Sequence, residues 1–171
     1  LMERGIANNG EIIEKTCRSF YYVLYHKNGW INTEGKNGDA YRKFVEECPE
    51  IKYVYIFDKE NIENESLVYS EGIASNEIFT GLYGVDVEPP IKYYEKRPSL
   101  MRFARLPIDM ENEGQISREE LKKLIYGDFL DYIKEKNLHI TGDMMGVKIG
   151  FSREEDREWQ YVLLNLPVER D

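Results

Sequence analysis

Aromatic side chains alternate along the last apolar segment of the chain, Trp159-Gln-Tyr-Val-Leu-Leu-Asn-Leu166. Residues two apart in a β-strand face the same side, so Trp159, Tyr161, Leu163 and Asn165 share one face. Aromatic rings on a concave face can stack on another ring or on a cation, at about 0.5–2 kcal/mol per contact. The same face could instead pack against helices as core, and both interpretations stay open.

A second aromatic strand is predicted at Tyr53-Val-Tyr-Ile-Phe57, where Tyr53, Tyr55 and Phe57 share a face. Tyr21 and Tyr22 alternate in the first strand, so only one of them can face a cleft. The residues that we expect to contact a ligand are Trp159, Tyr161, Tyr53, Tyr55, Tyr22, Phe103, Met145 and Glu158.

Residues for other chemistry are few. His26 and His139 are the two histidines and have no neighbours at metal-ligand spacing, so no metal site is expected. The two cysteines, Cys17 and Cys48, are expected to be free thiols. The chain has no Gly-x-Ser-x-Gly elbow, no phosphate-binding glycine loop and no Cys–His pair in a known context. We therefore predict no catalytic residues and no cofactor.

Composition limits the partners. A net charge of −9 and a pI near 4.9 oppose direct contact with nucleic acid by this segment. No apolar run is long enough to span a bilayer, and no secretory leader is recognised, so a cytoplasmic location is expected. Residues 1–10 are typical of the end of a linker or of an N-terminal extension.

The sequence predicts the same order of structural elements twice, and these elements must position the side chains named above. The segments Glu11–Leu24 and Ile91–Ala104 each contain a charged strand-like run, a basic turn at Arg18 or Arg97, a serine and a second apolar run. A helical stretch, a strand, an acidic turn and another strand follow in both. We predict an α+β fold of two duplicated β-α-β-β units, residues 11–88 and 89–168. They would form an antiparallel sheet with two helices packed on it and a central, pseudo-two-fold cleft.

Local signals are clearest in the second unit. Ser117-Arg-Glu-Glu120 is a capping box that predicts a helix running to about Glu135. A strand follows over 145–151, with glycines at two same-face positions, Gly146 and Gly150. Glycine there leaves room for a close neighbour, either a helix or a ligand.

The first unit is predicted from similar signals. Asp39 is expected to cap a short helix that ends at Cys48-Pro49. An acidic turn is expected over 58–65, and a further strand over Leu82–Val87. Pro167 is expected to stop the closing strand of the second unit.

Together these pieces resemble the gyrase-inhibitor-like (GyrI-like) effector-binding domain, found alone and at the C-terminus of MerR-family and AraC-family transcription regulators. The resemblance rests on the doubled element order and on the strand preceding the second unit, Leu82–Val87. In the second unit it rests on the helix and on Lys136-Asn-Leu138, Gly142-Asp, Gly146, Phe151, the acidic turn and Leu166-Pro167-Val168. It covers nearly everything from Glu11 to Val168.

The resemblance implies a ligand-binding domain over 11–168, with an aromatic cleft that takes planar and often cationic organic molecules. The multidrug-binding members place a carboxylate near the centre of the closing strand, where this chain has Leu163. Glu158, at the start of that strand, should face away from Trp159 and Tyr161. Other acids that could serve instead are Glu14, Glu95 and Asp143.

Three functions stay open at this stage. The first is a small-molecule effector-binding domain of a bacterial transcription regulator, with DNA reached through a tethered N-terminal domain and a homodimer in the full-length protein. The second is a stand-alone GyrI-like hydrolase of small molecules. The third is an acidic protein-binding module.

Overall fold

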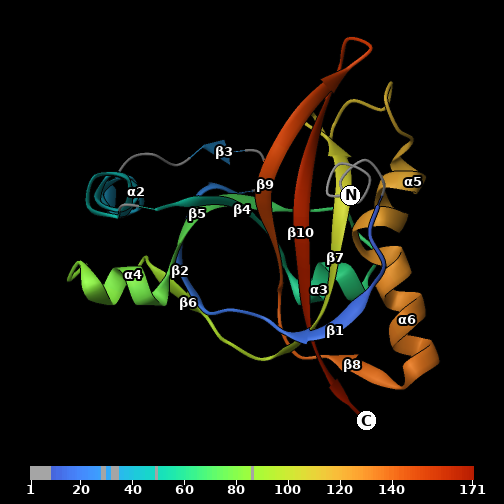
Figure 1. The fold of residues 1–171 in the computed structure, drawn as a ribbon, viewed down its shortest axis with the longest axis horizontal. Coiled ribbons are helices and arrows are strands. Elements are labelled where there is room, and N and C mark those ends of the chain that lie inside the picture. Colours follow the sequence, from blue (N-terminus) through green and yellow to red (C-terminus); the bar gives the residue numbers. More distant parts are fainter. Residues whose placement is uncertain (1–8, 28–29, 32–34, 49, 86) are drawn as a thin grey trace.

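The computed structural model describes residues 9–27, 30–31, 35–48, 50–85 and 87–171. The chain forms one mostly antiparallel sheet with helices packed on it (Figure 1). The strands are β1 (Ile13–Thr16), β2 (Phe20–Lys27), β3 (Trp30–Ile31), β4 (Lys52–Phe57), β5 (Ser70–Asn76), β6 (Lys92–Tyr94), β7 (Pro98–Pro107), β8 (Leu138–Ile140), β9 (Met144–Glu154) and β10 (Arg157–Arg170). The helices are α2 (Gly35–Glu47), α3 (Lys59–Glu63), α4 (Glu77–Leu82), α5 (Arg118–Lys122) and α6 (Asp128–Lys136). The predicted α+β class is confirmed.

The strand order is β1-β7-β10-β9-β4-β5-β2-β3. The antiparallel pair of β4 and β9 lies at its centre, where Val54 faces Val147 and Tyr55 faces Gly146. The order is β4-β5-β2 on one side of this pair and β9-β10-β7 on the other. β1, of the first predicted half, lies beside β7, and β6, of the second, pairs with β2, so one strand of each predicted half lies on the other side of the sheet. The division into halves and the duplication stay predictions.

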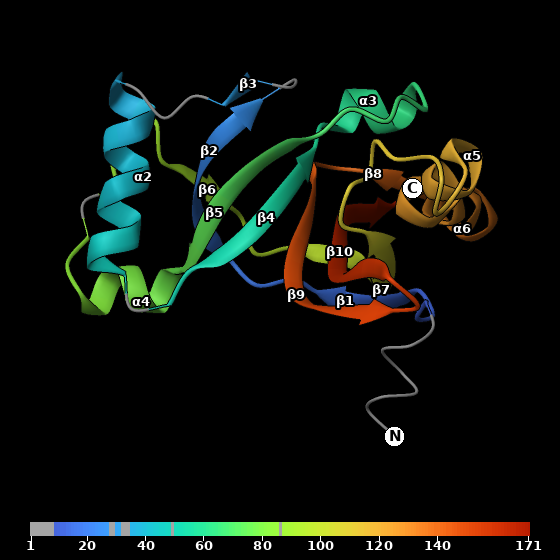
Figure 2. The ribbon, with the colours of Figure 1, turned by 90° about the horizontal axis from the view of Figure 1, so that it is seen from above.

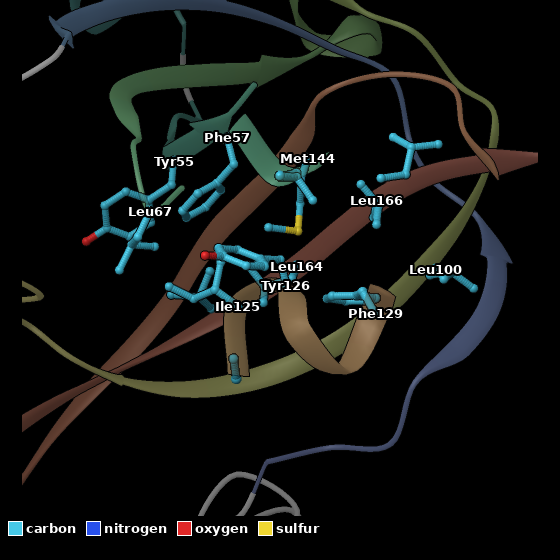
Figure 3. Close-up of a cluster of buried hydrophobic side chains, with 14 of the residues drawn as sticks. Tyr55, Phe57, Leu67, Leu100, Ile125, Tyr126, Phe129, Met144, Leu164 and Leu166 are labelled. Atoms are coloured by element: carbon cyan, nitrogen blue, oxygen red, sulfur yellow. The ribbon is translucent and has the colours of Figure 1, made fainter. Parts of the chain in front are cut away.

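The described helices that pack on the sheet lie on one of its faces, where they bury two apolar clusters against the strands. Phe129 of α6 and Ile125 pack against Leu164 and Leu166 of β10 in a buried cluster that also holds Tyr55 (Figure 3). Helix α2 packs through Phe44 on the other half of the same face. Figure 2 shows α2 beside β2 and β5, and α5 and α6 beside β7 and β10.

The opposite face of the sheet carries a third buried cluster, made by Tyr22, Val54, Ile56, Ala74 and Met145 together with other members: Cys17, Tyr94 and Val147. Two short connections close this side. Residues 17–19 join β1 to β2, and residues 95–97 join β6 to β7, so each connection runs from one end of the sheet to the other (Figure 1).

The two connections are paired with each other. Thr16 pairs with Pro98, the Cys17 N–H donates to the Arg97 carbonyl at 3.0 Å, and Phe20 pairs with Tyr94. In all three pairs the residue numbers add up to the same value. The antiparallel register between β1 and β7 is therefore the same as that between β2 and β6. We call these residues, 16–20 and 94–98, the crossing ribbon.

The predicted helix of the second half is confirmed. The Ser117 hydroxyl accepts a hydrogen bond from the Glu120 N–H at 3.2 Å, and helical turns follow from Arg118 to Lys136 with a π-helical turn at Lys123–Gly127. Asn137 ends the helix in the left-handed conformation, with φ 55°.

Several predicted elements of the first half differ. No strand forms among the described residues of Leu82–Val87. Leu82 is instead the last residue of helix α4. The Asn76 side chain caps the start of this helix, because its Oδ1 accepts a hydrogen bond from the Ile78 N–H at 2.9 Å. Asp39 lies inside α2, which begins earlier, and its carboxylate pairs with Arg42 at 2.6 Å. Helix α3 occupies the predicted acidic turn.

Pro167 does not stop the closing strand. β10 continues to Arg170 because its last residues pair with β8, and the Pro167 carbonyl accepts from the Thr141 N–H at 2.9 Å. The prediction for residues 1–10 lies largely outside the described residues. Of these, Gly10 lies along β7 and donates its N–H to the Phe103 carbonyl at 2.8 Å.

Candidate functional site

A pocket of about 560 Å³ opens on the sheet face that lies opposite the helices. This volume is in the usual range for small-molecule sites. Both predicted halves contribute to it. The lining residues are Lys15, Thr16, Arg18, Phe20, Glu50, Lys52, Asn76, Met101, Val147, Ile149, Leu163 and Asn165.

The floor of the pocket is apolar. Leu163 of β10 pairs with Val147 of β9, and Met101 of β7 pairs with Asn165. Ile149 is the extra residue of β9 where the register shifts between Tyr161 and Val162. This irregularity leaves Ile149 46% exposed, so it adds apolar surface to one side of the pocket.

Asn165 brings an amide to this floor although it is only 5% exposed. Its Nδ2 donates to the Met145 carbonyl at 3.3 Å and to the Leu163 carbonyl at 3.2 Å. Within the described part of the chain no donor bonds to its Oδ1. A buried amide oxygen that faces a pocket is a natural acceptor for a ligand.

The crossing ribbon forms one wall. Tyr94 donates its hydroxyl to the Asp143 carbonyl at 2.9 Å and lies 3.3 Å from the Asn165 carbonyl. Burial raises the pKa of Tyr94 well above its usual value. Arg97 donates from Nη1 to the Thr141 carbonyl at 2.9 Å. These bonds fix the wall to the turn before β9 and to β10, so the pocket shape is set by tertiary contacts.

The rim is charged. Lys15, Arg18 and Lys52 supply cations and Glu50 supplies an anion. Lys52 Nζ lies 3.2 Å from Glu50 Oε1, with both side chains close to half exposed, so water screens this pair strongly.

The predicted aromatic floor lies farther along β10. Trp159 and Tyr161 share the face of Leu163 and Asn165, as predicted, but they lie beyond the register shift. The Arg105 guanidinium covers the Trp159 ring at 4.0 Å from its centroid, and the Tyr161 hydroxyl is 2.9 Å from Ser152 Oγ. Both aromatic side chains therefore already have partners from within the chain.

The other predicted residues are distributed over both faces. Tyr22 and Met145 belong to the buried cluster on the pocket side, and Phe103 is 46% exposed on that side of β7. Tyr53 and Tyr55 face the helices instead, because Val54 and Ile56 take the pocket side of β4.

Glu158 faces away from Trp159 and Tyr161, in agreement with the alternation. It pairs with Arg153 at 2.9 Å on the other face. Of the further acids, Glu14 bonds Tyr132 and Arg170, and Asp143 accepts from the Lys59 N–H at 2.8 Å. None of the eight predicted ligand-binding residues, and none of these acids, lines the 560 Å³ pocket. As ligand contacts they stay predictions.

Sequence reasoning missed most of the pocket. Leu163 and Asn165 were on the predicted face, so alternation was a sufficient signal for them. Arg18 was marked as the basic turn of the repeat, but nothing local showed that this turn crosses the sheet. Val147 and Ile149 were overlooked between the two glycines of their strand.

Gly146 has the close neighbours that its position predicted. A Cβ added there would lie 2.9 Å from Val162 Cγ1 and 3.2 Å from Leu164 Cδ2, whereas one added at Gly150 would meet nothing within 4 Å. The neighbours are strand side chains rather than a helix or a ligand.

Other chemistry finds little support within the described ranges. Cys17 and Cys48 are free and buried. No group of three or more His, Cys, Asp or Glu side chains is placed to hold a metal ion in the part of the chain that the structure describes. Among the described helices, none has the length and apolar character needed to cross a membrane.

Known proteins share the fold. No protein-family model and no curated protein matches the sequence. The chain is similar to the crystal structure of the EcmrR C-terminal domain, with a TM-score of 0.56 and 12% identity over 95% of this chain and 99% of that one. It is also similar to a chain in a cryo-EM structure of an EcmrR–DNA complex in EcmrR-RPo, with a TM-score of 0.57 and 12% identity over 99% of this chain. It spans 61% of that longer chain. At this identity the comparison shows a common fold.

Proposed function

We propose that this chain is a small-molecule effector-binding domain of a bacterial transcription regulator, of the GyrI-like type. The observation that carries the proposal is the 560 Å³ pocket with its apolar floor, built by residues from both halves of the sheet. The fold that this chain shares with the EcmrR C-terminal domain over almost the whole of both chains supports it.

A ligand in this pocket contacts both halves at once. Leu163 and Met101 belong to the second half, and Phe20 and Lys52 to the first. A molecule that binds better to one relative position of the halves shifts the domain toward that position. A largely apolar body matches the apolar surface of Leu163, Val147 and Met101. The domain acts by binding and not by catalysis.

DNA is contacted through a separate N-terminal domain in this proposal. The net charge of −9 opposes direct contact by this segment. One similar chain of known structure comes from an EcmrR–DNA complex and is longer than this chain. The full-length regulator acts as a cytoplasmic homodimer on its operator.

The test fills the pocket and measures binding. Naphthalene-based probes are titrated into the chain, and amide chemical shifts are followed by NMR together with calorimetry. We expect saturable shifts at Val147, Leu163 and Asn165, and loss of binding in Leu163→Trp, whose indole occupies the floor. Val68→Trp, on an exposed loop, is the matched control and should bind like the parent chain. Binding that survives Leu163→Trp in a folded protein would contradict the proposal.

A further inference from the structure

The charged residues that line the pocket are mostly basic, although the chain as a whole is acidic. The chain has 32 acidic and 23 basic residues, whereas the pocket is lined by three basic residues and one acidic residue. A pocket that sampled this composition would be lined by slightly more acids than bases. Its local charge therefore favours an anion over a cation.

Two of the three cations are available to a ligand. Lys52 and Glu50 pair with each other at 3.2 Å and largely cancel. Lys15 directly precedes the crossing ribbon and Arg18 belongs to it; both line the pocket, and neither has an ion-pair partner among the described residues. They leave the rim with a net positive charge.

Of the acids near this rim, Glu77 and Glu14 have partners within the chain, whereas Glu95 of the crossing ribbon is exposed, has no ion pair among the described residues and does not line the pocket. Glu77 accepts from the Ser19 hydroxyl at 2.6 Å and from the Tyr93 hydroxyl at 3.1 Å, and it does not line the pocket. Glu14 accepts from Tyr132 and pairs with Arg170. No carboxylate among the described lining residues other than Glu50 is therefore placed to hold a cationic ligand.

The floor carries no acid either. Leu163 occupies its centre with an apolar side chain, and the polar group beside it is the neutral amide of Asn165. Burying a cation on this floor would leave its charge uncompensated, which is costly. An apolar ring system has no such cost there.

We propose that the effector is an amphipathic organic acid. Its planar apolar body lies on the Leu163–Val147 floor, and its carboxylate meets the Arg18 guanidinium and the Lys15 ammonium at the rim. Arginine suits this role because its planar donors match a carboxylate. This inference rests on the proposed effector-binding function and specifies its ligand class.

The experiment compares three probes that share one ring system and differ in charge: 2-naphthoate, 2-naphthamide and 2-naphthylmethylammonium. Calorimetry gives the dissociation constant of each for the whole chain at low and at moderate salt. We expect naphthoate to bind most tightly and naphthylmethylammonium least tightly. Added salt should weaken naphthoate binding and leave naphthamide binding almost unchanged.

Substitutions of the rim residues test whether the preference for naphthoate comes from Arg18 and Lys15. Arg18→Gln and Lys15→Gln should each weaken naphthoate binding by roughly fivefold, the upper range for an exposed ion pair. Each should weaken naphthamide binding much less than naphthoate binding, because only the carboxylate carries a charge. Lys134→Gln removes an exposed cation of α6 far from the pocket and is the control, with no effect on any probe. Leu163→Glu should reverse the preference toward naphthylmethylammonium.

The outcomes separate the two proposals. If naphthamide or naphthylmethylammonium binds most tightly and Leu163→Trp abolishes that binding, the anionic ligand is wrong and the effector-binding function stands. If naphthoate binds most tightly but equally well in Arg18→Gln and Lys15→Gln, the rim assignment is wrong. Binding of none of the probes to the folded chain would overturn both.

Discussion

The Lys148 ammonium lies 3.1 Å from Glu71 Oε1 and 4.3 Å from the centroid of the Tyr55 ring. Lys148 belongs to β9 and Glu71 to β5, with Tyr55 on β4 between them. The three side chains therefore form a contact across the junction of the two halves, on the helix side of the sheet. About a quarter of each charged side chain is exposed, 27% for Lys148 and 23% for Glu71.

Removing this contact should destabilise the fold. Lys148→Met removes the ammonium from Glu71 and leaves this partly buried carboxylate with only His26 Nδ1, 3.3 Å from Oε2, at an expected loss of about 1–2 kcal/mol in the free energy of unfolding. Urea denaturation of Lys148→Met, Glu71→Gln and the double variant gives the coupling energy. Lys59→Met removes one partner of an exposed helical pair with Glu63 and should cost no more than about 0.5 kcal/mol. Zero coupling between Lys148 and Glu71 would contradict the predicted contribution of this ion pair to stability.

The two glycines of β9 should respond differently to the same substitution. Gly146→Ala drives a methyl group against Val162 and Leu164, so we expect a loss of about 1–3 kcal/mol in unfolding free energy. Gly150→Ala meets no atom within 4 Å and should be neutral or stabilising by up to about 1 kcal/mol. Thermal and urea unfolding of the pair measure this. Equal effects of the two substitutions would refute the packing described for Gly146.

Alkaline pH should destabilise the protein through its buried tyrosines. Burial is the main cause that raises the pKa of Tyr22 to about 12, with smaller effects from Asp143 and Asp58. Burial likewise raises the pKa of Tyr55 to about 12, against a lowering by Gln160, with a further increase from Glu71.

Between pH 10 and 12 the unfolded chain releases protons that the folded chain keeps, so stability is complete below pH 10 and falls as the pH rises through this window. The fall should be about 1 kcal/mol per tyrosine for each pH unit. Unfolding free energies measured across this range in the parent, Tyr22→Phe and Tyr55→Phe chains test it. Each variant should show a shallower decrease, and an unchanged slope in both would contradict the assignment.

The start of the second-half helix should depend on one hydroxyl. Ser117→Ala removes the acceptor of the Glu120 N–H, at an expected cost of about 1 kcal/mol. Ser117→Thr keeps an acceptor and should stay within a few tenths of a kcal/mol of the parent. Hydrogen exchange of the Glu120 amide, with urea unfolding, distinguishes a local loss of the cap from a general effect. Faster exchange is expected only in the alanine variant.

Local signals were enough for some of the fold. The helix start at Ser117 was predicted because a cap depends on residues three apart, and the shared face of Trp159 and Leu163 because strand alternation is equally local. The strand predicted at Leu82 was wrong because the Asn76 side chain caps a helix there, which apolar pattern alone does not show.

The pocket could not be predicted in the same way. Its wall depends on the Cys17–Arg97 hydrogen bond, which joins residues far apart in sequence. The register shift beside Tyr161 then separates the aromatic end of β10 from the pocket floor. Both features follow from how strands pair across the whole sheet. The basic rim formed by Lys15 and the apolar floor were therefore visible only in the structure.

The short strands at the ends of the sheet have a consequence for behaviour in concentrated solution. β1 has four residues, β3 two and β6 three, and the two connections of the crossing ribbon bond to each other. Long open strands expose unpaired backbone groups that can recruit strands from other molecules. The terminal strands β1 and β3 therefore offer only short stretches of outer backbone, so strand addition at these two ends of the sheet is disfavoured. The long, apolar β10 is protected separately, because β7 and β9 pair with it on its two sides.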